Sequence, residues 1–295
     1  MGELSDERDR MPRWMLRPVK HGASFHRVEE ILEEQQLNTV CVGAKCPNRG
    51  ECYAALTATF MIMGDCCTRD CGFCAVAGGI PGPLDAGEPA RVAKAASAMG
   101  LSHIVVTSVN RDDVPDGGAA HIANVVEAAR EAMPDATVEV LVPDFQGSPE
   151  AIETVLESRP DVFNHNVETV RRLYDSVRPQ ADYIRSLYVL GYAADAGLAV
   201  KSGFMVGLGE SPAEVDELLG DLLDTGCSLV TAGQYLRPTE ANAPVKRYWD
   251  PEEFEALRVK ALEMGFRAAA AGPLVRSSYF AHQMLENAGL AAIAE

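Results

Sequence analysis

Residues 57–74 read TATFMIMGDCCTRDCGFC, a short apolar segment followed at once by four cysteines. The apolar segment, residues 58–63, predicts a buried β-strand and begins a pattern in which short apolar runs alternate with helical periodicity. The further predicted strands are residues 103–107, 137–142, 161–164, 199–206 and 228–233. The predicted helices are residues 89–99, 119–133, 149–158, 181–196, 212–225 and 251–264.

Six strand–helix units in alternation indicate a parallel sheet covered by helices. Right-handed crossovers between sequential strands curl such a sheet into a barrel. Because six units fall short of eight, we expect an α/β fold, a partial (β/α)6 TIM-like barrel, with a doubly wound sheet as the alternative. The helices that start at Ser148, Ser211 and Asp250 each combine a capping residue with a following proline.

Two segments flank the predicted barrel, which spans residues 57–265. Residues 1–56 form an N-terminal extension that carries three cysteines and one predicted helix, residues 25–36. Residues 266–295 form a C-terminal segment with a short strand and a helix that wraps back. We therefore expect three parts, with the barrel in the middle.

Polar side chains gather directly after the predicted strands, where parallel barrels build their active sites. After the first three strands these are Cys67, Cys71, Cys74, Thr107, Ser108, Arg111, Asp112, Asp113 and Asp144. After the last three they are His165, Asn166, Glu168, Glu210, Gln234 and Tyr235. We expect His165 to be a hydrogen-bonded structural residue, since a lone histidine near a strand end is more often that than a base.

Composition excludes several classes of protein. The chain has 295 residues with 47% hydrophobic residues and a formal net charge of −17. Binding of nucleic acid needs clustered lysine and arginine, so we expect no nucleic-acid partner. No apolar run reaches the ~20 residues of a membrane helix, and residues 1–20 lack the apolar core of a secretory signal. We expect no membrane association and a cytoplasmic location.

Seven of the eight cysteines fall within residues 41–74. Six of these seven form two groups of three, Cys41-x4-Cys46-x5-Cys52 and Cys67-x3-Cys71-x2-Cys74, and Cys66 belongs to neither group. A disulfide framework is typical of short secreted chains, so clustered thiols here indicate metal or redox chemistry. Zinc sites usually pair C-x2-C knuckles into four ligands, whereas three thiolates on a four-iron cluster leave one iron open. We expect Cys66 and Cys227 to be structural.

The second cysteine group, with Phe73 before its last thiol, resembles the signature of the radical S-adenosylmethionine superfamily. The resemblance narrows to the lipoyl synthase family through CVGAKCPNRGEC, FMIMGDCCTRDCGFCAV, TSVNRDDVPDGGA, EVLVPDFQG, FNHNVETV, KSGFMVGLGE, GQYLRPT and GPLVRSSY. These motifs occur in the family's order over residues 12–279. The pair of three-cysteine motifs together with RSSY is highly specific.

The resemblance implies an enzyme, a sulfurtransferase with two 4Fe–4S clusters and S-adenosylmethionine as cofactors. It implies that the cluster on Cys67, Cys71 and Cys74 reduces S-adenosylmethionine to a 5′-deoxyadenosyl radical. The auxiliary cluster would be held by Cys41, Cys46, Cys52 and Ser278, the serine before the tyrosine of RSSY. This cluster would give its sulfur to C6 and C8 of a protein-bound octanoyl-lysine, forming the lipoyl cofactor. A hard alkoxide binds iron less firmly among sulfides than a thiolate does.

The resemblance also implies residues that contact S-adenosylmethionine or substrate. For the cofactor these are Phe73, Thr107, Ser108, Asn166, Glu168, Gly207 and Glu210. Arg178 and Arg276 are candidates to bind a carboxylate or the substrate amide. The chain departs from the family at Asn242 and Phe280, where histidine is usual; we expect neither to touch a cluster ligand.

The implied partners are octanoylated lipoyl-carrier domains, such as the acyltransferase component of 2-oxo acid dehydrogenases and the glycine-cleavage H protein. A ferredoxin or flavodoxin would supply electrons, and an iron–sulfur carrier would rebuild the auxiliary cluster. Arg237, Lys246 and Arg247 are our candidates for a basic docking patch. Two alternatives stay open: another radical S-adenosylmethionine sulfur-inserting enzyme with a different acceptor, and a zinc-binding interaction module on a barrel.

Overall fold

A computed structural model describes residues 11–15 and 22–290 of the chain. Its main sheet has the order β1-β2-β5-β6-β7-β8-β9-β10, and neighbouring strands are parallel except for the antiparallel pair β1–β2. The strands are β1 (Asn38–Thr39), β2 (Thr59–Ile62), β5 (His103–Ser108), β6 (Thr137–Leu141), β7 (Val162–Asn164), β8 (Ala199–Val206), β9 (Leu229–Gln234) and β10 (Ala268–Gly272). The two end strands do not pair with each other, so the sheet is an open barrel.

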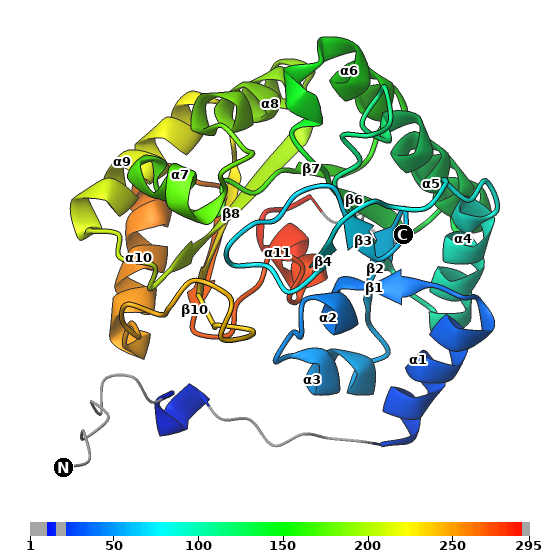
Figure 1. Ribbon diagram of the computed structural model, residues 1–295, viewed down its shortest axis with the longest axis horizontal. Helices are drawn as coiled ribbons and strands as arrows, with labels where there is room; N and C mark the ends of the chain where they lie inside the picture. Colours follow the sequence, from blue (N-terminus) through cyan, green and yellow to red (C-terminus); the bar gives the residue numbers. More distant parts are fainter. Residues whose placement is uncertain (1–10, 16–21, 291–295) are drawn as a thin grey trace.

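Helices cover the outside of this sheet, as the alternation of strands and helices predicts (Figure 1). They are α4 (Glu88–Met99), α5 (Ala119–Ala132), α6 (Pro149–Glu157), α8 (Tyr183–Asp195), α9 (Pro212–Asp224) and α10 (Pro251–Met264). The predicted caps are confirmed: Ser148 accepts from the Ala151 N–H and Ser211 forms a capping box with Glu214. The Asp250 N–H donates to Glu253, which completes the reciprocal pair at the start of α10. Within the described residues, no helix is long and apolar enough to cross a membrane.

The segments on either side of the barrel complete the sheet. The N-terminal segment contributes α1 (Ala23–Glu34), β1, α2 (Val40–Gly43) and α3 (Arg49–Ala54), and the C-terminal segment contributes β10 and α11 (Ala281–Asn287). In Figure 1, α2 and α3 lie between β1 and β10. The buried Asn48 side chain donates to the Leu274 carbonyl across this gap. The two ends of the chain therefore fill the opening of the barrel.

Helix α11 plugs the interior of the barrel. It lies at the centre of the ring of strands in Figure 1, and Met284, Leu285 and Ala288 pack against Val162, Leu229 and Ala268. These last three residues stand at or near the starts of their strands. The apolar plug therefore lies at the amino-terminal edge of the barrel, and the carboxyl edge is left for a site. The predicted C-terminal strand is β10, which pairs with β9 in the wall of the barrel, and the predicted C-terminal helix is α11, which lies inside it.

Candidate active site

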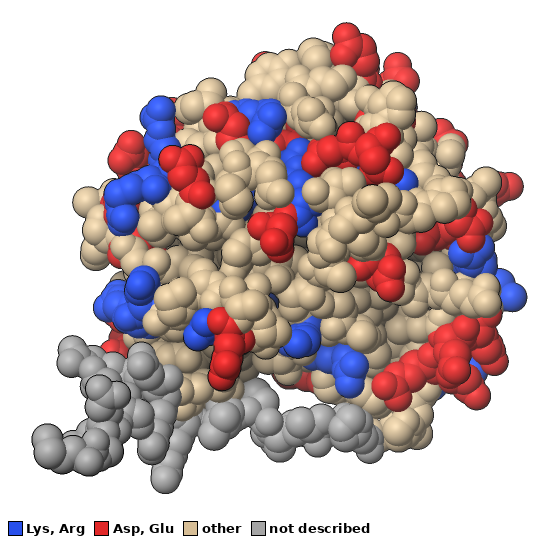
Figure 2. Space-filling model, in the orientation of Figure 1, with Lys and Arg blue, Asp and Glu red and all other residues tan. Residues whose placement is uncertain are grey.

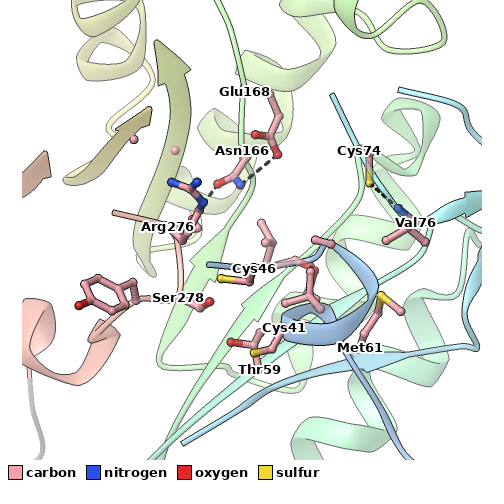
Figure 3. A pocket seen from close by; sticks show the side chains of 18 of the residues that line it. Cys41, Cys46, Thr59, Met61, Cys74, Val76, Asn166, Glu168, Arg276 and Ser278 are labelled. Carbon is pink, nitrogen blue, oxygen red and sulfur yellow. Dashed lines mark hydrogen bonds between the residues drawn. The ribbon is translucent and has the colours of Figure 1, made fainter. Parts of the chain in front are cut away.

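Both groups of three cysteines face one cavity of about 550 Å3 at the carboxyl edge of the barrel. Cys41 and Cys52 lie on α2 and α3, and Cys46 lies between these helices. Cys67 lies on β3 (Cys66–Cys67), which pairs with β4 (Ala77–Gly78) and encloses the loop of Cys71 and Cys74. Figure 3 shows the side chains of Ser278 and Cys46 among those that line the cavity. Ser278 lines the same cavity as the six thiols.

Backbone N–H groups point at the sulfurs of the second cysteine group. The N–H groups of Arg69 and Asn110 donate to Cys67 Sγ over 3.4 and 3.3 Å, and the Val76 N–H donates to Cys74 Sγ over 3.4 Å (Figure 3). Hydrogen bonds of this kind stabilise negative charge on sulfur and tune the potential of iron–sulfur clusters. These N–H groups oppose the effect of burial but do not outweigh it, because burial raises the pKa of Cys74 to about 11 and also raises that of Cys71.

The cysteine loop is tied to the barrel by the buried Arg69 side chain. Its guanidinium contacts both oxygens of Asp112 at 2.7 and 2.8 Å and one oxygen of Asp144 at 2.7 Å. Arg185 also contacts Asp144, at 2.9 Å. Burial alone would raise the pKa of Asp144, but these cations lower it to about 2. Arg69 is a positioning residue that we did not predict, although a charged residue inside a cysteine motif is itself a signal.

The first cysteine group is also attached by side chains: Tyr53 on α3 is buried and hydrogen-bonded to Thr39, and the Thr57 hydroxyl donates to the Cys52 carbonyl. Besides the bond from Asn48 to Leu274, the Tyr279 hydroxyl donates to Glu51 on α3 over 2.9 Å. Burial raises the pKa of Cys41 to about 11 and that of Cys52 to about 12, and the neighbouring thiols add to both shifts. A metal group bound here must therefore displace protons.

The thiols of each group are close but do not converge on one ion. Among the described side chains, no three of His, Cys, Asp or Glu are arranged to hold a single metal ion. Each group offers three thiols to the cavity, a donor set that is compatible with an iron–sulfur cluster. All eight cysteines are free thiols.

Five of the predicted cofactor-binding residues line the cavity: Phe73, Thr107, Ser108, Asn166 and Glu168. Asn166 donates to Glu168 over 3.1 Å, and burial raises the pKa of Glu168 (Figure 3). Glu168 has a left-handed backbone with φ of +65°, held by a bridge to Phe204 on β8. Strained non-glycine positions persist where surrounding structure enforces them, often at functional sites. This bridge directs the carboxylate into the cavity.

The other two predicted cofactor residues lie outside the cavity lining. The Glu210 carboxylate accepts the N–H groups of Gly207, Leu208 and Gly209, and also the Trp249 indole N–H. Gly207 has φ of +97°, and a Cβ there would stand 2.1 Å from the Gln234 amide. The GFMVGLGE motif thus builds a tight turn after β8.

Both predicted substrate arginines line the cavity. Arg178 donates to the carbonyls of Asn166 and Val167, while its Nε has no partner among the described residues. Ser108 Oγ and Asn110 Oδ1 are likewise buried and unpaired within the described chain. Buried polar atoms normally have partners, so these three await a ligand.

Other predicted polar residues support the fold. His165 is confirmed as a hydrogen-bonded structural residue, between the Val142 carbonyl and Ser186. Arg111 pairs with Asp113 and contacts the Gly82 carbonyl. Neither Asp112 nor Asp144 lines the cavity, and neither does Gln234, whereas Tyr235 does.

Four positions remain: the two cysteines outside the groups of three, and the two residues at which the chain departs from the family. Cys227 is buried with its thiol donating to the Leu229 carbonyl, and Cys66 lies outside the cavity lining. The expectation that Asn242 avoids the cluster ligands is wrong, because its amide donates to the Cys74 carbonyl over 2.8 Å. The short polar side chain reaches the loop because Ala243 pairs with Gly72. Phe280 lines the cavity and packs against Tyr279 with ring centroids 4.4 Å apart.

A parallel barrel that presents a C-x3-C-x2-C loop after its first parallel strand defines a radical S-adenosylmethionine protein. The sequence model of the Radical SAM superfamily matches residues 61–222. The fold is similar to methylornithine synthase, with a TM-score of 0.54 over 75% of this chain and 73% of that one at 14% identity. It is also similar to HydG, a maturase of the FeFe-hydrogenase, with a TM-score of 0.56 over 83% of this chain and 62% of that one at 15% identity.

Within the superfamily, the chain belongs to the lipoyl synthase family of sulfur-inserting enzymes. It is 53% identical to the lipoyl synthase of Rubrobacter xylanophilus over 94% of this chain and 87% of that one. It is 54% identical to the lipoyl synthase of Caldanaerobacter subterraneus subsp. tengcongensis over 92% and 96% of the two chains. The resemblance identified from the motifs is thereby confirmed.

Proposed function

We propose that the chain inserts two sulfur atoms, at C6 and C8, into an octanoyl group carried on a lysine of another protein, and that each cysteine group holds one 4Fe–4S cluster. The observation that carries this proposal is that both cysteine groups and Ser278 line a single cavity. A substrate chain in that cavity can reach both groups without leaving the protein. In this arrangement Cys67, Cys71 and Cys74 would hold a cluster able to supply the electron for cleavage of S-adenosylmethionine, and Cys41, Cys46 and Cys52 would hold a cluster able to supply sulfur.

The protein's own side chains position the reactants. Ser108, Asn110 and Arg178 offer unpaired polar atoms in the part of the cavity that holds Cys67 and Cys71. We assign them, with Phe73, Asn166 and Glu168, to S-adenosylmethionine. Holding reactants in place removes much of the entropic barrier to their reaction.

Apolar side chains surround the space in which the octanoyl group would lie. Met61, Val105, Leu141, Val142 and Phe204 line the cavity. They bind an alkyl chain and exclude water, which protects a reactive intermediate from side reactions. Arg276 lies in this cavity near Cys46 and Glu168 and is our candidate for the amide end of the substrate.

Ser278 is our candidate for the fourth ligand of the auxiliary cluster. Both serines in RSSY line the cavity. The Ser277 hydroxyl is engaged, since it donates to Asn166 and accepts from Asn164, whereas no hydrogen bond of the Ser278 hydroxyl is found within the described residues. This division leaves Ser278 as the serine available to iron.

The partner would be an octanoylated lipoyl-carrier domain, of the 2-oxo acid dehydrogenase or glycine-cleavage type. Arg237 lines the cavity, while Arg247 is paired with Glu253 and stacked on Trp249. Figure 2 shows acidic and basic side chains interspersed on this face, so a docking patch would be small and centred on Arg237. We also propose a ferredoxin or flavodoxin as electron donor, an iron–sulfur carrier, and a cytoplasmic location, where free thiols stay reduced.

Replacing Cys46 by Ala tests whether the two cysteine groups have the separate roles proposed for them. In anaerobically reconstituted protein we expect Cys46→Ala to form 5′-deoxyadenosine from S-adenosylmethionine but no lipoyl product on an octanoyl-lysyl peptide. Cys71→Ala is the matched variant and should abolish both. The parent protein should hold about eight irons with equal sulfide. Zinc without sulfide, or loss of both activities in Cys46→Ala, would contradict the proposal.

A further inference from the structure

A chain of buried polar side chains runs through the barrel from β6 to the cavity. Lys201 on β8 forms an ion pair with Glu139 on β6, with Nζ to carboxylate distances of 2.9 and 3.0 Å. The Asn164 amide on β7 donates to Glu139 over 2.8 Å and to the Ser277 hydroxyl over 3.0 Å. Lys201, Glu139 and Asn164 are all at most 1% exposed.

The chain continues from Ser277 to the cavity. The Ser277 hydroxyl donates to Asn166 Oδ1 over 2.8 Å, and the Asn166 amide donates to Glu168 over 3.1 Å. Gly203 lies on β8, and a Cβ there would stand 2.8 Å from Asn166 Oδ1 and 3.1 Å from Ser277 Oγ. Only glycine at this position leaves room for the two side chains. These hydrogen bonds connect Ser277 of the C-terminal segment to Asn164 on β7 and to Asn166, which follows β7.

The Glu139 carboxylate determines which group donates in each hydrogen bond of this chain. Burial alone would raise the pKa of Glu139, but the charge and hydrogen bonds of Lys201 together with those of His103 lower it, so Glu139 is ionised. An ionised carboxylate only accepts, so the Asn164 NH2 group must face it. That same group then meets the Ser277 oxygen, which leaves the Ser277 hydrogen for Asn166. The side-chain oxygen Oδ1 of Asn164 is left without a partner in the described chain, which an apolar residue would have avoided.

We propose that Asn164 and Ser277 are positioning residues that couple the two halves of the site. Ser277 is covalently next to Ser278, the candidate ligand of the auxiliary cluster, and is hydrogen-bonded through Asn166 to Glu168 on the S-adenosylmethionine side. One buried bridge thus fixes both the loop of Ser278 and the carboxylate of Glu168. This inference rests on the proposed function, because it concerns the two clusters assigned there.

Ser277→Ala tests the coupling in two full-length backgrounds, each with one cysteine group replaced by alanine. With Cys67, Cys71 and Cys74 replaced, the readout is the rate at which a ferrous chelator strips iron from the remaining cluster. With Cys41, Cys46 and Cys52 replaced, it is the dissociation constant for S-adenosylmethionine. We expect about a two- to ten-fold increase in both, the change that loss of one hydrogen bond produces.

Ser158→Ala is the matched control, because Ser158 is also buried and its hydroxyl donates to the Val155 carbonyl at the end of α6. It should change neither readout. Asn164→Leu removes both bonds of the bridge and should produce larger changes in the same directions. If it does not fold, Ser277→Ala alone decides.

A response of only one readout to Ser277→Ala, or equal responses to Ser158→Ala, would overturn the coupling. The failure of the proposed function is distinguishable from this. A background that fails to bind about four irons overturns the proposed function and the inference with it. Normal iron content with an unresponsive Ser277→Ala overturns the inference alone.

Discussion

The two cysteine segments share one cavity, yet they are built differently. The segment of Cys67–Cys74 is anchored by the buried Arg69, by N–H bonds to its sulfurs, and by contacts with Asn110, Val177 and Asn242. The segment of Cys41–Cys52 lies on two short helices in the open gap of the barrel. Its described links to the C-terminal segment are the Asn48–Leu274 and Tyr279–Glu51 hydrogen bonds.

This difference matches the two roles proposed for the segments. A group that is used again in every turnover benefits from a loop held in one conformation. A group that is dismantled benefits from ligands on elements that can shift, since stability is not uniform across a protein and lightly packed elements open first. The two cysteine segments thus differ in the way that the proposed roles would require.

The largest effect should come from removing the anchor of the Cys67–Cys74 segment. Arg69→Met leaves the buried Asp144 and the partly buried Asp112 without their main partner. Breaking a buried pair by removing one partner typically costs about 3–5 kcal/mol of unfolding free energy. Urea unfolding of the metal-free protein measures this loss.

The exposed pair of Arg258 and Glu255 on α10 provides the control for Arg69. Arg258→Met should cost less than about 1 kcal/mol, because solvent screens exposed pairs. If the two arginine variants proved equally stable, the view of Arg69 as the anchor of the cysteine loop would be wrong.

The free energy of unfolding should depend on pH through the buried His165. Burial, and then the charge of Arg178, lower the pKa of His165 to about 4. The unfolded chain takes up a proton below its pKa of about 6.5 while the folded chain does not, so stability falls as pH drops from about 6.5 to about 4. The loss for this one group is at most about 3 kcal/mol. Urea unfolding at several pH values should show a flatter profile for His165→Gln than for the parent.

His26 on α1 is the matched control, since its side chain is 67% exposed. His26→Gln should change the pH profile less than His165→Gln does, because solvent screens its exposed pair with Glu29. A His165→Gln profile that stays parallel to that of the parent would mean that folding does not shift the pKa of His165.

Periodicity was sufficient to predict the central architecture, because alternating strands and helices follow from local apolar patterns. The predicted strand of residues 199–206 coincides with β8, and the six predicted helices differ from α4, α5, α6, α8, α9 and α10 only at their ends, whereas α7 (Tyr174–Val177) was not predicted. The extra parts were not predictable in this way. Strand β1 has two residues, and α2 and α3 are short because the cysteine segment must fill the barrel gap. Tertiary contacts, more than local propensity, determine such elements.

For the site, spacing predicted the cysteine groups because ligand chemistry constrains sequence directly. It could not predict Arg69 with Asp144, or Asn164 with Ser277, since these partners are 75 and 113 residues apart in sequence. The same limit explains Glu210, whose acidic side chain resembles a ligand group but caps a backbone turn. A single sequence reports the residue type at a position, whereas the role of a polar residue depends on its partner.

The smallest effects should compare the two segments directly. Asn48 and Asn242 each donate one side-chain hydrogen bond, to Leu274 and to Cys74, over 2.6 and 2.8 Å. Each alanine variant loses about 1 kcal/mol of hydrogen bonding. Because the Cys67–Cys74 segment has other anchors, Asn242→Ala should barely change amide exchange in residues 67–79 of the metal-free protein. Asn48→Ala should instead accelerate exchange in residues 40–54 about five-fold, as the loss of 1 kcal/mol from a locally opening segment predicts. Equal acceleration in the two variants would mean that the segments are equally anchored, and the contrast drawn between them would fail.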